Sequence, residues 1–406
     1  MTKPRRRQAG EGGISEYQTQ AGTRYLIKFW VTNEDGTRRQ KLQRGFLTRK
    51  EAARELRRVL PEAERPGGFV EPTKMTVGAW LDQWIEGLQL APSTVSSYRK
   101  NVRLHLKPRL GASPLAGLTG ARISTLYREL ERTGRQDHRS GEPLSARTIR
   151  YVHTILKAAL RDAVEQGLIT VNPADKAKPP AARAAKAPDI HPWTGPQLHA
   201  FLGWSSCHAV AVHASAWHVL AYTGMRRGEL LALRWRDLDL DKATVSVRRS
   251  VGVVKTKGEG ERIVEGTTKS TKPRVIDIDT ETMELFRRLR LDRAGLSLQL
   301  VRDDALIFAD LDGAYLHPER FSRTFTEQLA RCRKALGDDA MPTIRLHDLR
   351  HTHATLLLQA GVPVKVVSER LGHATVMITL EIYAHVMPGM QREAAATFAA
   401  MIGGAS

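Results

Sequence analysis

Two short stretches in the C-terminal half of the chain combine side chains that suit a phosphate. The first, TGMRRGEL over residues 223–230, carries Arg226 and, three positions on, Glu229. The second, LHDLRHTHAT over residues 346–355, places His347 and Arg350 three positions apart, on one face of an expected helix. An imidazole and a guanidinium both donate towards an anion, and a phosphodiester fits that pair. Taken alone, the first stretch predicts no more than a helical ion pair.

A third stretch, LGHATVMITLEIYAH over residues 371–385, adds His373 at an expected helix boundary and Tyr383 on the following helix. A tyrosine hydroxyl becomes a nucleophile when a neighbouring group takes its proton. In isolation, such a tyrosine would be assigned to the core. His351 and His353 raise the alternative of a metal site, but no carboxylate or cysteine lies nearby at zinc-binding spacing.

The order of these residues closely resembles the tyrosine recombinase family, which includes the integrases of phages and integrative elements. An arginine comes first, then a histidine with an arginine, a further histidine and finally a tyrosine, and the three stretches show no departure from the family pattern. The resemblance implies an enzyme in which Tyr383 attacks a DNA phosphodiester, forms a 3′-phosphotyrosyl bond and releases a 5′-hydroxyl. Because this covalent bond conserves the energy of the broken one, no ATP is expected.

The resemblance also implies a role for each site residue. Arg226 and Arg350 would hold the two non-bridging oxygens of the phosphate and stabilise the charge that grows in the transition state. His347 would take part in proton transfer with the hydroxyl of Tyr383, and His373 would donate a hydrogen bond to the same phosphate. With two arginines in place, we expect no metal and no other cofactor, and activity in the presence of a chelator.

In this family a lysine on a β-hairpin protonates the departing 5′-oxygen. The lysines in the corresponding region are Lys255, Lys257, Lys269 and Lys272. We expect Lys269 to be the general acid, because residues 267–270, just ahead of an expected strand at 274–278, look most like the family position, and Lys272 is the next candidate. Glu229 is expected to orient the first arginine rather than to carry protons.

The charge of the chain supports a polyanionic partner. The 406 residues carry a formal net charge of +20, with a sequence pI near 10.2, which favours double-stranded DNA as the ligand. The excess is +8 over residues 1–65, +9 over 66–188 and +3 over 189–406. We therefore expect residues 1–188 to supply most of the electrostatic attraction to DNA.

Other compositional features narrow the class of protein. No run of 18 or more apolar residues occurs, and no apolar segment follows the basic N-terminus, so we expect a cytoplasmic protein associated with the bacterial nucleoid. Cys207 and Cys332 are the only cysteines, too few for a disulfide framework or a zinc site.

The predicted fold class is mainly α with a small β component, divided into several domains. The expected parts, in chain order, are a disordered basic tail (1–16), an arm-type DNA-binding module with a three-stranded sheet and a helix (17–65), a helical core-binding bundle of the SAM-like kind (74–171), a linker (172–192), a catalytic domain (193–390) and a C-terminal tail helix (391–406).

Local patterns predict several individual elements. An Asp-Gly turn joins expected strands at 23–32 and 38–44. Thr48, with Glu51 three residues on, predicts the start of a helix that runs to Val59. In the bundle, Ser93 or Thr94 is expected to cap a helix. In the catalytic domain, strands are expected at 244–251 and 274–278, with a Gly- and Lys-rich turn region over 252–273.

The resemblance further implies an assembly and partners. Strand exchange between two attachment sites needs a homotetramer on DNA that passes through a Holliday junction. An arm-type module implies integration of a mobile element, with excision dependent on a directionality factor (excisionase) or a DNA-bending host protein. The tail helix could pack on its own domain or on a neighbouring protomer, and the sequence leaves both open.

Two other functions use similar residues. A type IB topoisomerase-like enzyme would relax DNA as a monomer, without choosing a site. A DNA-binding protein that has lost catalysis would serve as a regulator. The two-part basic N-terminal region weighs against the first alternative, and the intact set of five site residues weighs against the second.

Overall fold

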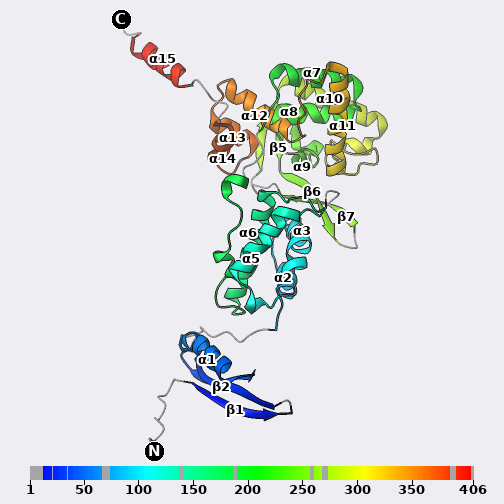
Figure 1. The fold of residues 1–406 in the computed structure, drawn as a ribbon. Coiled ribbons are helices and arrows are strands. Elements are labelled where there is room, and N and C mark those ends of the chain that lie inside the picture. The colour runs from blue at the N-terminus through cyan, green and yellow to red at the C-terminus, as the bar shows by residue number, and fades with distance from the viewer. Residues whose placement is uncertain are drawn as a thin grey trace, which may run out of the picture. The chain divides into compact units, whose positions relative to one another are not determined.

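The computed structural model describes residues 12–20, 22–33, 35–65, 74–136, 140–185, 190–256, 260–267, 273–384 and 390–403. The chain divides into two units, residues 1–187 and 188–406 (Figure 1). Helices predominate and the sheets are small, which confirms the predicted fold class. None of the helices in these ranges is long and apolar enough to cross a membrane.

The N-terminal part of the first unit is an antiparallel meander with one helix packed on it. Its elements are β1 (Gly13–Thr19), β2 (Gly22–Thr32), β3 (Arg38–Phe46) and α1 (Arg49–Glu64). Ile27, Phe29 and Val31 alternate along β2 and are almost fully buried, as expected of a strand with one face on a core. Because β1 begins at Gly13, the end of the expected disordered tail is part of the sheet.

Helix α1 begins where the sequence predicts and ends later. The hydroxyl of Thr48 accepts a hydrogen bond from the backbone N–H of Glu51, as the capping pattern predicts. The helix continues past Val59 to Glu64, with Pro61 inside it. Ala63, one turn after Val59, is fully buried, so this last turn still packs on the sheet.

The rest of the first unit is a helical bundle around a tryptophan-rich core. Its elements are α2 (Val77–Glu86), α3 (Pro92–Asn101), the π-helical turn η1 (Val102–Leu106), α4 (Lys107–Leu110), η2 (Leu115–Gly117), α5 (Gly120–Thr133) and α6 (Ala146–Glu165). Trp80 is buried and donates from its indole N–H to the carbonyl of Ala159, which joins α2 to α6. Helix α3 starts at Pro92, ahead of the expected cap, because proline suits the first helical position.

Residues 172–180, expected to be an extended linker, lie against the bundle. The amide of Asn172 donates to the carbonyl of Lys157 (3.0 Å), and the backbone N–H of Lys178 donates to the hydroxyl of Ser124 (3.0 Å). A short 3₁₀ turn, η3 (Pro173–Lys176), occurs in this segment, and a second, η4 (Ala182–Ala185), follows it. The linker is therefore more ordered than its proline and alanine content predicts.

The second unit is built mainly of helices (Figure 1). They surround an aromatic core that includes Trp193, Trp217 and Phe325. Its helices are α7 (Gly195–His208), α8 (Ala211–Thr223), α9 (Arg227–Leu230), η5 (Trp235–Asp237), α10 (Thr280–Leu296), η6 (Leu298–Val301), α11 (Pro318–Leu336), α12 (Asp348–Gln359), α13 (Val364–Leu371), α14 (Val376–Tyr383) and α15 (Met390–Gly403).

The strands of the second unit form two separate sheets. Strands β4 (Leu238–Asp239), β5 (Thr244–Val247) and β8 (Arg274–Asp277) form an antiparallel sheet in the order β4-β5-β8, whereas β6 (Arg249–Thr256) and β7 (Gly260–Thr267) form a hairpin. The expected strand at 244–251 is thus divided, and the expected turn region holds most of a hairpin. Gly228 of α9 approaches the backbone of Val251 so closely that no side chain fits between them.

Candidate active site

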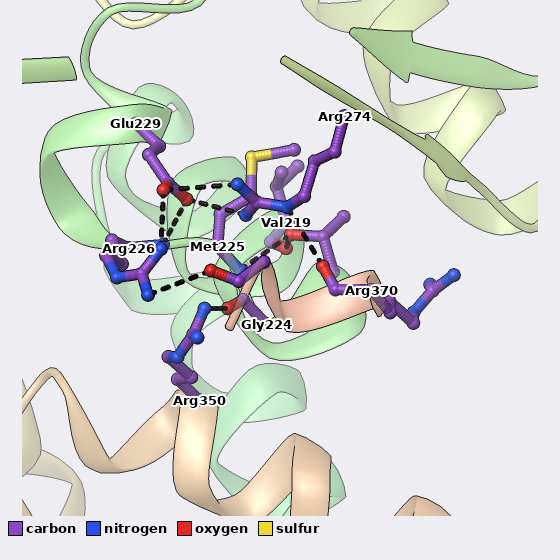
Figure 2. Close-up of polar contacts among 10 residues, drawn as sticks. Val219, Gly224, Met225, Arg226, Glu229, Arg274, Arg350 and Arg370 are labelled. Atoms are coloured by element: carbon purple, nitrogen blue, oxygen red, sulfur yellow. Dashed lines mark hydrogen bonds and ion pairs between the residues drawn. The ribbon is translucent and has the colours of Figure 1, made fainter. Parts of the chain in front are cut away.

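Arg350 is a buried guanidinium with an unpaired donor. It lies on α12 with 3% of its surface exposed, and its Nη1 donates to the carbonyl of Gly224 at 2.7 Å (Figure 2). Its Nη2 is buried and has no hydrogen-bond partner in the structure. Burial, and then the nearby charge of Arg226, lowers the pKa of Arg350 to about 9. An unpaired buried donor on a cation is costly, so this group is suited to receive an anion.

Arg226 stands at the N-terminal cap of α9, where it is held by Glu229. Its backbone is extended (ψ 149°), so it precedes the helix that was expected to carry it. Its Nη1 and its backbone N–H donate to the two carboxylate oxygens of Glu229 at 2.9 and 3.0 Å. The expected ion pair is therefore present, and it orients a guanidinium that remains 26% exposed (Figure 2).

Arg274, at the start of β8, is a site residue that the sequence did not reveal. It donates from Nη1 and Nη2 to the carboxylate of Glu229 at 3.2 and 2.7 Å, and from Nε to the carbonyl of Arg370 (Figure 2). Burial acts to raise the pKa of Glu229. The hydrogen bonds and positive charges of Arg274 and Arg226 have a larger, opposite effect and hold this pKa below its usual value. A charged carboxylate thus links the two arginines.

Two glycines in left-handed conformation explain the Thr-Gly and Leu-Gly pairs of the motifs. Gly224 (φ +64°) ends α8 and Gly372 (φ +66°) ends α13. The carbonyl of Gly224 accepts from Arg350, and that of Gly372 accepts from Arg226 at 3.2 Å. A Cβ on Gly372 would lie 2.8 Å from Nη1 of Arg274, so only glycine fits there. Helix ends therefore position both arginines.

His347 and His373 are held neutral beside these cations. His347 caps α12 and its side chain is exposed, but the protein atoms around it and the charges of His351 and Arg350 lower its pKa to about 4. Burial and then Arg350 lower the pKa of His373 to about 4 as well. Nδ1 of His373 lies 2.8 Å from the hydroxyl of Thr379, so Nε2 is the nitrogen that can contact a phosphate.

Tyr383 is almost fully enclosed, with 1% of its surface exposed at the end of α14. Its hydroxyl lies 2.7 Å from Nδ1 of His351, and burial raises its pKa to about 12. The sequence predicted His347 as the proton partner of this hydroxyl, whereas the structure places His351 there. Residues i+3 and i+4 share a helical face, and the signal that could have found His351 was this spacing from His347.

The alternative of a metal site gains no support from the geometry. Nε2 of His353 accepts from Nε of Arg370 at 3.1 Å, and His351 is engaged with Tyr383. Within the parts of the chain that the structure describes, no group of three or more His, Cys, Asp or Glu side chains could hold a metal ion.

Comparison with known proteins identifies the family. Residues 197–389 match the model of the phage integrase family, and residues 15–63 match that of an arm DNA-binding domain. Residues 197–389 form a tyrosine recombinase domain of the phage integrase family. The first range contains every residue of the expected active site, and the second covers most of the sheet-and-helix module.

Three relatives illustrate the range of proteins that this recombinase is similar to. A XerC-like tyrosine recombinase of Caldanaerobacter subterraneus subsp. tengcongensis is 26% identical, over 82% of this chain and 85% of the relative. The integrase of Mycobacterium phage D29 is 29% identical, over 78% and 76%. The ICEBs1 integrase of Bacillus subtilis is 26% identical, over 75% and 77%.

Solved structures agree with this assignment. The Tn1549 transposon integrase in complex with circular intermediate DNA covers 80% of this recombinase and 100% of that chain, with a TM-score of 0.66 and 25% identity. A lambda integrase dimer bound to a core site covers 93% of this recombinase and 95% of that chain, with a TM-score of 0.51 and 18% identity, and supports the fold alone.

Of the four lysines that could be the general acid of this recombinase, the structure describes only Lys255. Lys257, Lys269 and Lys272 lie outside the described residues. Lys255 forms ion pairs with Glu261 (2.6 Å) and Glu319 (3.1 Å). Lys269 follows two residues after the end of β7, whose Glu265 pairs with Arg234 at 3.0 Å.

Proposed function

We propose that this recombinase is an integrase that uses Tyr383 to join two DNA attachment sites through a 3′-phosphotyrosyl intermediate. The observation that carries the proposal is the unpaired, buried Nη2 of Arg350 beside the exposed edge of Arg226. A phosphodiester would satisfy this donor and would be charge-matched to the pair. Integrases of phage D29 and of ICEBs1, to which this chain is similar, support the assignment of a mobile element as substrate.

In this mechanism the two arginines hold the non-bridging oxygens of the scissile phosphate. They stabilise the negative charge that develops as Tyr383 attacks. His347 and His373 contact the same phosphate, because both lie beside the arginines and are neutral at pH 7. A neutral imidazole donates one hydrogen bond without adding a third positive charge.

Lys269 is the proposed general acid for the departing 5′-oxygen. The β6–β7 hairpin supports this choice, because β7 ends two residues before Lys269 and is held in place by the ion pair between Glu265 and Arg234. Lys255 is less suited, since its ammonium is paired with two carboxylates. No metal or other cofactor is included in the proposed reaction.

The N-terminal sheet and helix are proposed to bind arm-type sites, and the bundle to bind the core site. A groove in the bundle supports the second assignment, because its lining includes the basic residues Lys100, Arg135, Arg147 and Arg150. Cationic side chains along a groove suit the phosphate backbone. Strand exchange requires a homotetramer on DNA, and excision an excisionase or a DNA-bending host protein.

A covalent trapping assay tests the proposal. The protein is incubated in chelator with a nicked duplex that carries a candidate attachment site, and a denaturing gel then separates the protein–DNA adduct. We expect an adduct with the wild-type protein and none with Tyr383→Phe, which lacks only the nucleophilic oxygen and still binds the duplex. Tight binding without an adduct on any candidate site would instead indicate a DNA-binding protein without catalysis.

A further inference from the structure

The hydrogen bond between His351 and Tyr383 joins two side chains that are both nearly buried. His351 lies on α12 and is 9% exposed, and Tyr383 lies on α14 and is 1% exposed. The two atoms, Nδ1 and Oη, are 2.7 Å apart, and the ring centroids are 5.7 Å apart. A bond of this length in a buried place is strong, because water does not compete for either atom.

Helix α12 ties this bond to the phosphate-binding arginine. His351 follows Arg350 directly in the sequence, and His347 precedes His351 by four residues. His347, which caps the helix, contacts the ring of His351 edge-on, with centroids 5.2 Å apart. One rigid element therefore carries the phosphate-binding side chains and the group that contacts the nucleophile.

We infer that His351 receives the phenolic proton of Tyr383 when this tyrosine attacks the phosphodiester. The inference rests on the proposed role of Tyr383 as nucleophile. As the bond between Oη and phosphorus forms, the proton passes to Nδ1 of His351, and the bond between phosphorus and the 5′-oxygen breaks. The departing oxygen takes a proton from the general acid, for which Lys269 is proposed. In rejoining, the protonated His351 returns its proton to the tyrosine oxygen.

The surroundings of His351 keep it able to accept a proton. Burial lowers its pKa below 6.5, and Arg350 and Arg345 act in the same direction, while Asp348 acts to raise it. Among the described residues, the other titratable groups near the ring include His347, His373 and Tyr383. His351 is therefore neutral at pH 7. A phosphate bound beside Arg350 would add negative charge and raise the pKa of His351, which makes it a stronger acceptor once DNA is bound.

A substrate with a sulfur leaving group separates this role from that of the general acid. A 5′-phosphorothiolate at the scissile position releases a thiolate, which needs no protonation. We expect Lys269→Ala to slow covalent capture on the ordinary substrate and to capture the phosphorothiolate at the wild-type rate. His351→Ala should be slower by about 100-fold on both substrates, because it lacks the proton acceptor.

Two further variants and a pH series sharpen the test. His351→Asn places an amide atom near the position of Nδ1, so it keeps a hydrogen bond but cannot take a proton, and it should be as slow as His351→Ala. His199→Ala removes an exposed histidine of the same unit and should capture DNA at the wild-type rate. With no acceptor, capture by His351→Ala should rise about tenfold per pH unit above pH 7, as hydroxide replaces the lost base.

The outcomes distinguish this inference from the proposed function. Wild-type capture rates in both His351 variants, with none in Tyr383→Phe, would overturn the proton transfer and leave the nucleophile in place. Full activity in His351→Asn but not in His351→Ala would show that His351 only positions the tyrosine, which also overturns the inference. Capture by Tyr383→Phe would instead overturn the proposed nucleophile. Circular dichroism and DNA binding show that each variant is folded.

Discussion

Nδ1 of His351, on α12, lies 2.7 Å from the hydroxyl of Tyr383, which lies at the end of α14 and is almost fully buried. This relationship means that the protein without DNA holds its proposed nucleophile in a place that solvent hardly reaches. Burial also raises the pKa of the phenol to about 12, so the reactive phenolate is scarce at neutral pH. Both effects protect Tyr383 from reactions outside the DNA complex.

We predict that Tyr383 resists acetylation by N-acetylimidazole in the absence of DNA. Tyr151, which is 36% exposed, provides the internal comparison. Tyr383 should be modified at least ~10-fold more slowly, since modification requires local opening of the structure. Peptide mass analysis after short exposure measures both sites, and the difference should disappear in denaturant. Equal rates in the native protein would show that the enclosed position is not the resting one.

Removing Arg274 should destabilise the second unit, because it leaves the buried carboxylate of Glu229 with one cation instead of two. Arg274→Met is expected to lower the free energy of unfolding by about 3 kcal/mol, and Glu229→Gln in the same chain should restore part of it. Denaturant titration measures this. Lys242→Met breaks an exposed ion pair with Asp239 and serves as the matched control, with no change expected. If Arg274→Met, like this control, left the free energy of unfolding unchanged, solvent would have to reach the carboxylate of Glu229.

A methyl group on Gly372 should disturb the site more than the same change at another left-handed glycine. Gly372→Ala places Cβ 2.8 Å from Arg274, whereas Gly361 (φ +80°) has no neighbouring atom within 4 Å of the added carbon. Both substitutions carry a backbone cost of about 1 kcal/mol. Only Gly372→Ala should also slow covalent capture, because it displaces the partner of Glu229. Equal losses of capture in both variants would remove the role we assign to this contact.

The structure brings His351 to Tyr383, a partner that the sequence did not predict. His347, Arg350 and Tyr383 were selected by the order of motifs that resembles the family, because local spacing alone would assign Tyr383 to the core, and their roles stay predictions. The bond between His351 and Tyr383 was not predicted, since His347 shares a face with both Arg350 and His351, and the packing of α12 on α14 decides which one meets the phenol.

Pairings between distant segments were also missed. Arg274 and Glu229 are 45 positions apart, and no local pattern pairs them. The β6–β7 hairpin was missed because its glycines and lysines are typical of turns, while the pairing of β6 with β7, in which Lys255 lies opposite Glu261, follows no local pattern. The fold class, in contrast, follows from helical periodicity and was predicted correctly.

The basic N-terminal part should contribute to the salt dependence of DNA binding. Residues 1–65 carry a net charge of +8. A variant that lacks them should show a shallower slope of log affinity against log salt concentration, by about 0.9 for each phosphate that the shortened protein no longer neutralises. Titration on a duplex with arm-type and core sites measures the slope. A truncated protein that keeps the wild-type slope, while still capturing a nicked core duplex, would show that this part does not bind DNA.

His105 should make the bundle sensitive to acid. It lies in η1 with 5% exposure, its Nδ1 is buried without a partner, and burial followed by the charges of Arg109 and Lys100 lowers its pKa to about 4. The unfolded chain takes up a proton as the pH falls through 6.5, whereas the folded chain resists until about pH 4. Stability is therefore complete above pH 6.5 and is lost on acidification, by about 2 kcal/mol at pH 5.

His105→Leu removes this titration and also the unpaired nitrogen. Between pH 7 and pH 5, the bundle of the variant should therefore lose about 2 kcal/mol less stability than that of the wild type. Hydrogen exchange in α5 and α6, corrected for the intrinsic pH dependence of amide exchange, measures the stability of this part within the full chain. The helices of the second unit provide the internal control, because His105 belongs to the core of the first. If both proteins lose protection equally in α5 and α6 at pH 5, the histidine is already protonated in the folded state, and its unpaired nitrogen must be accessible to solvent.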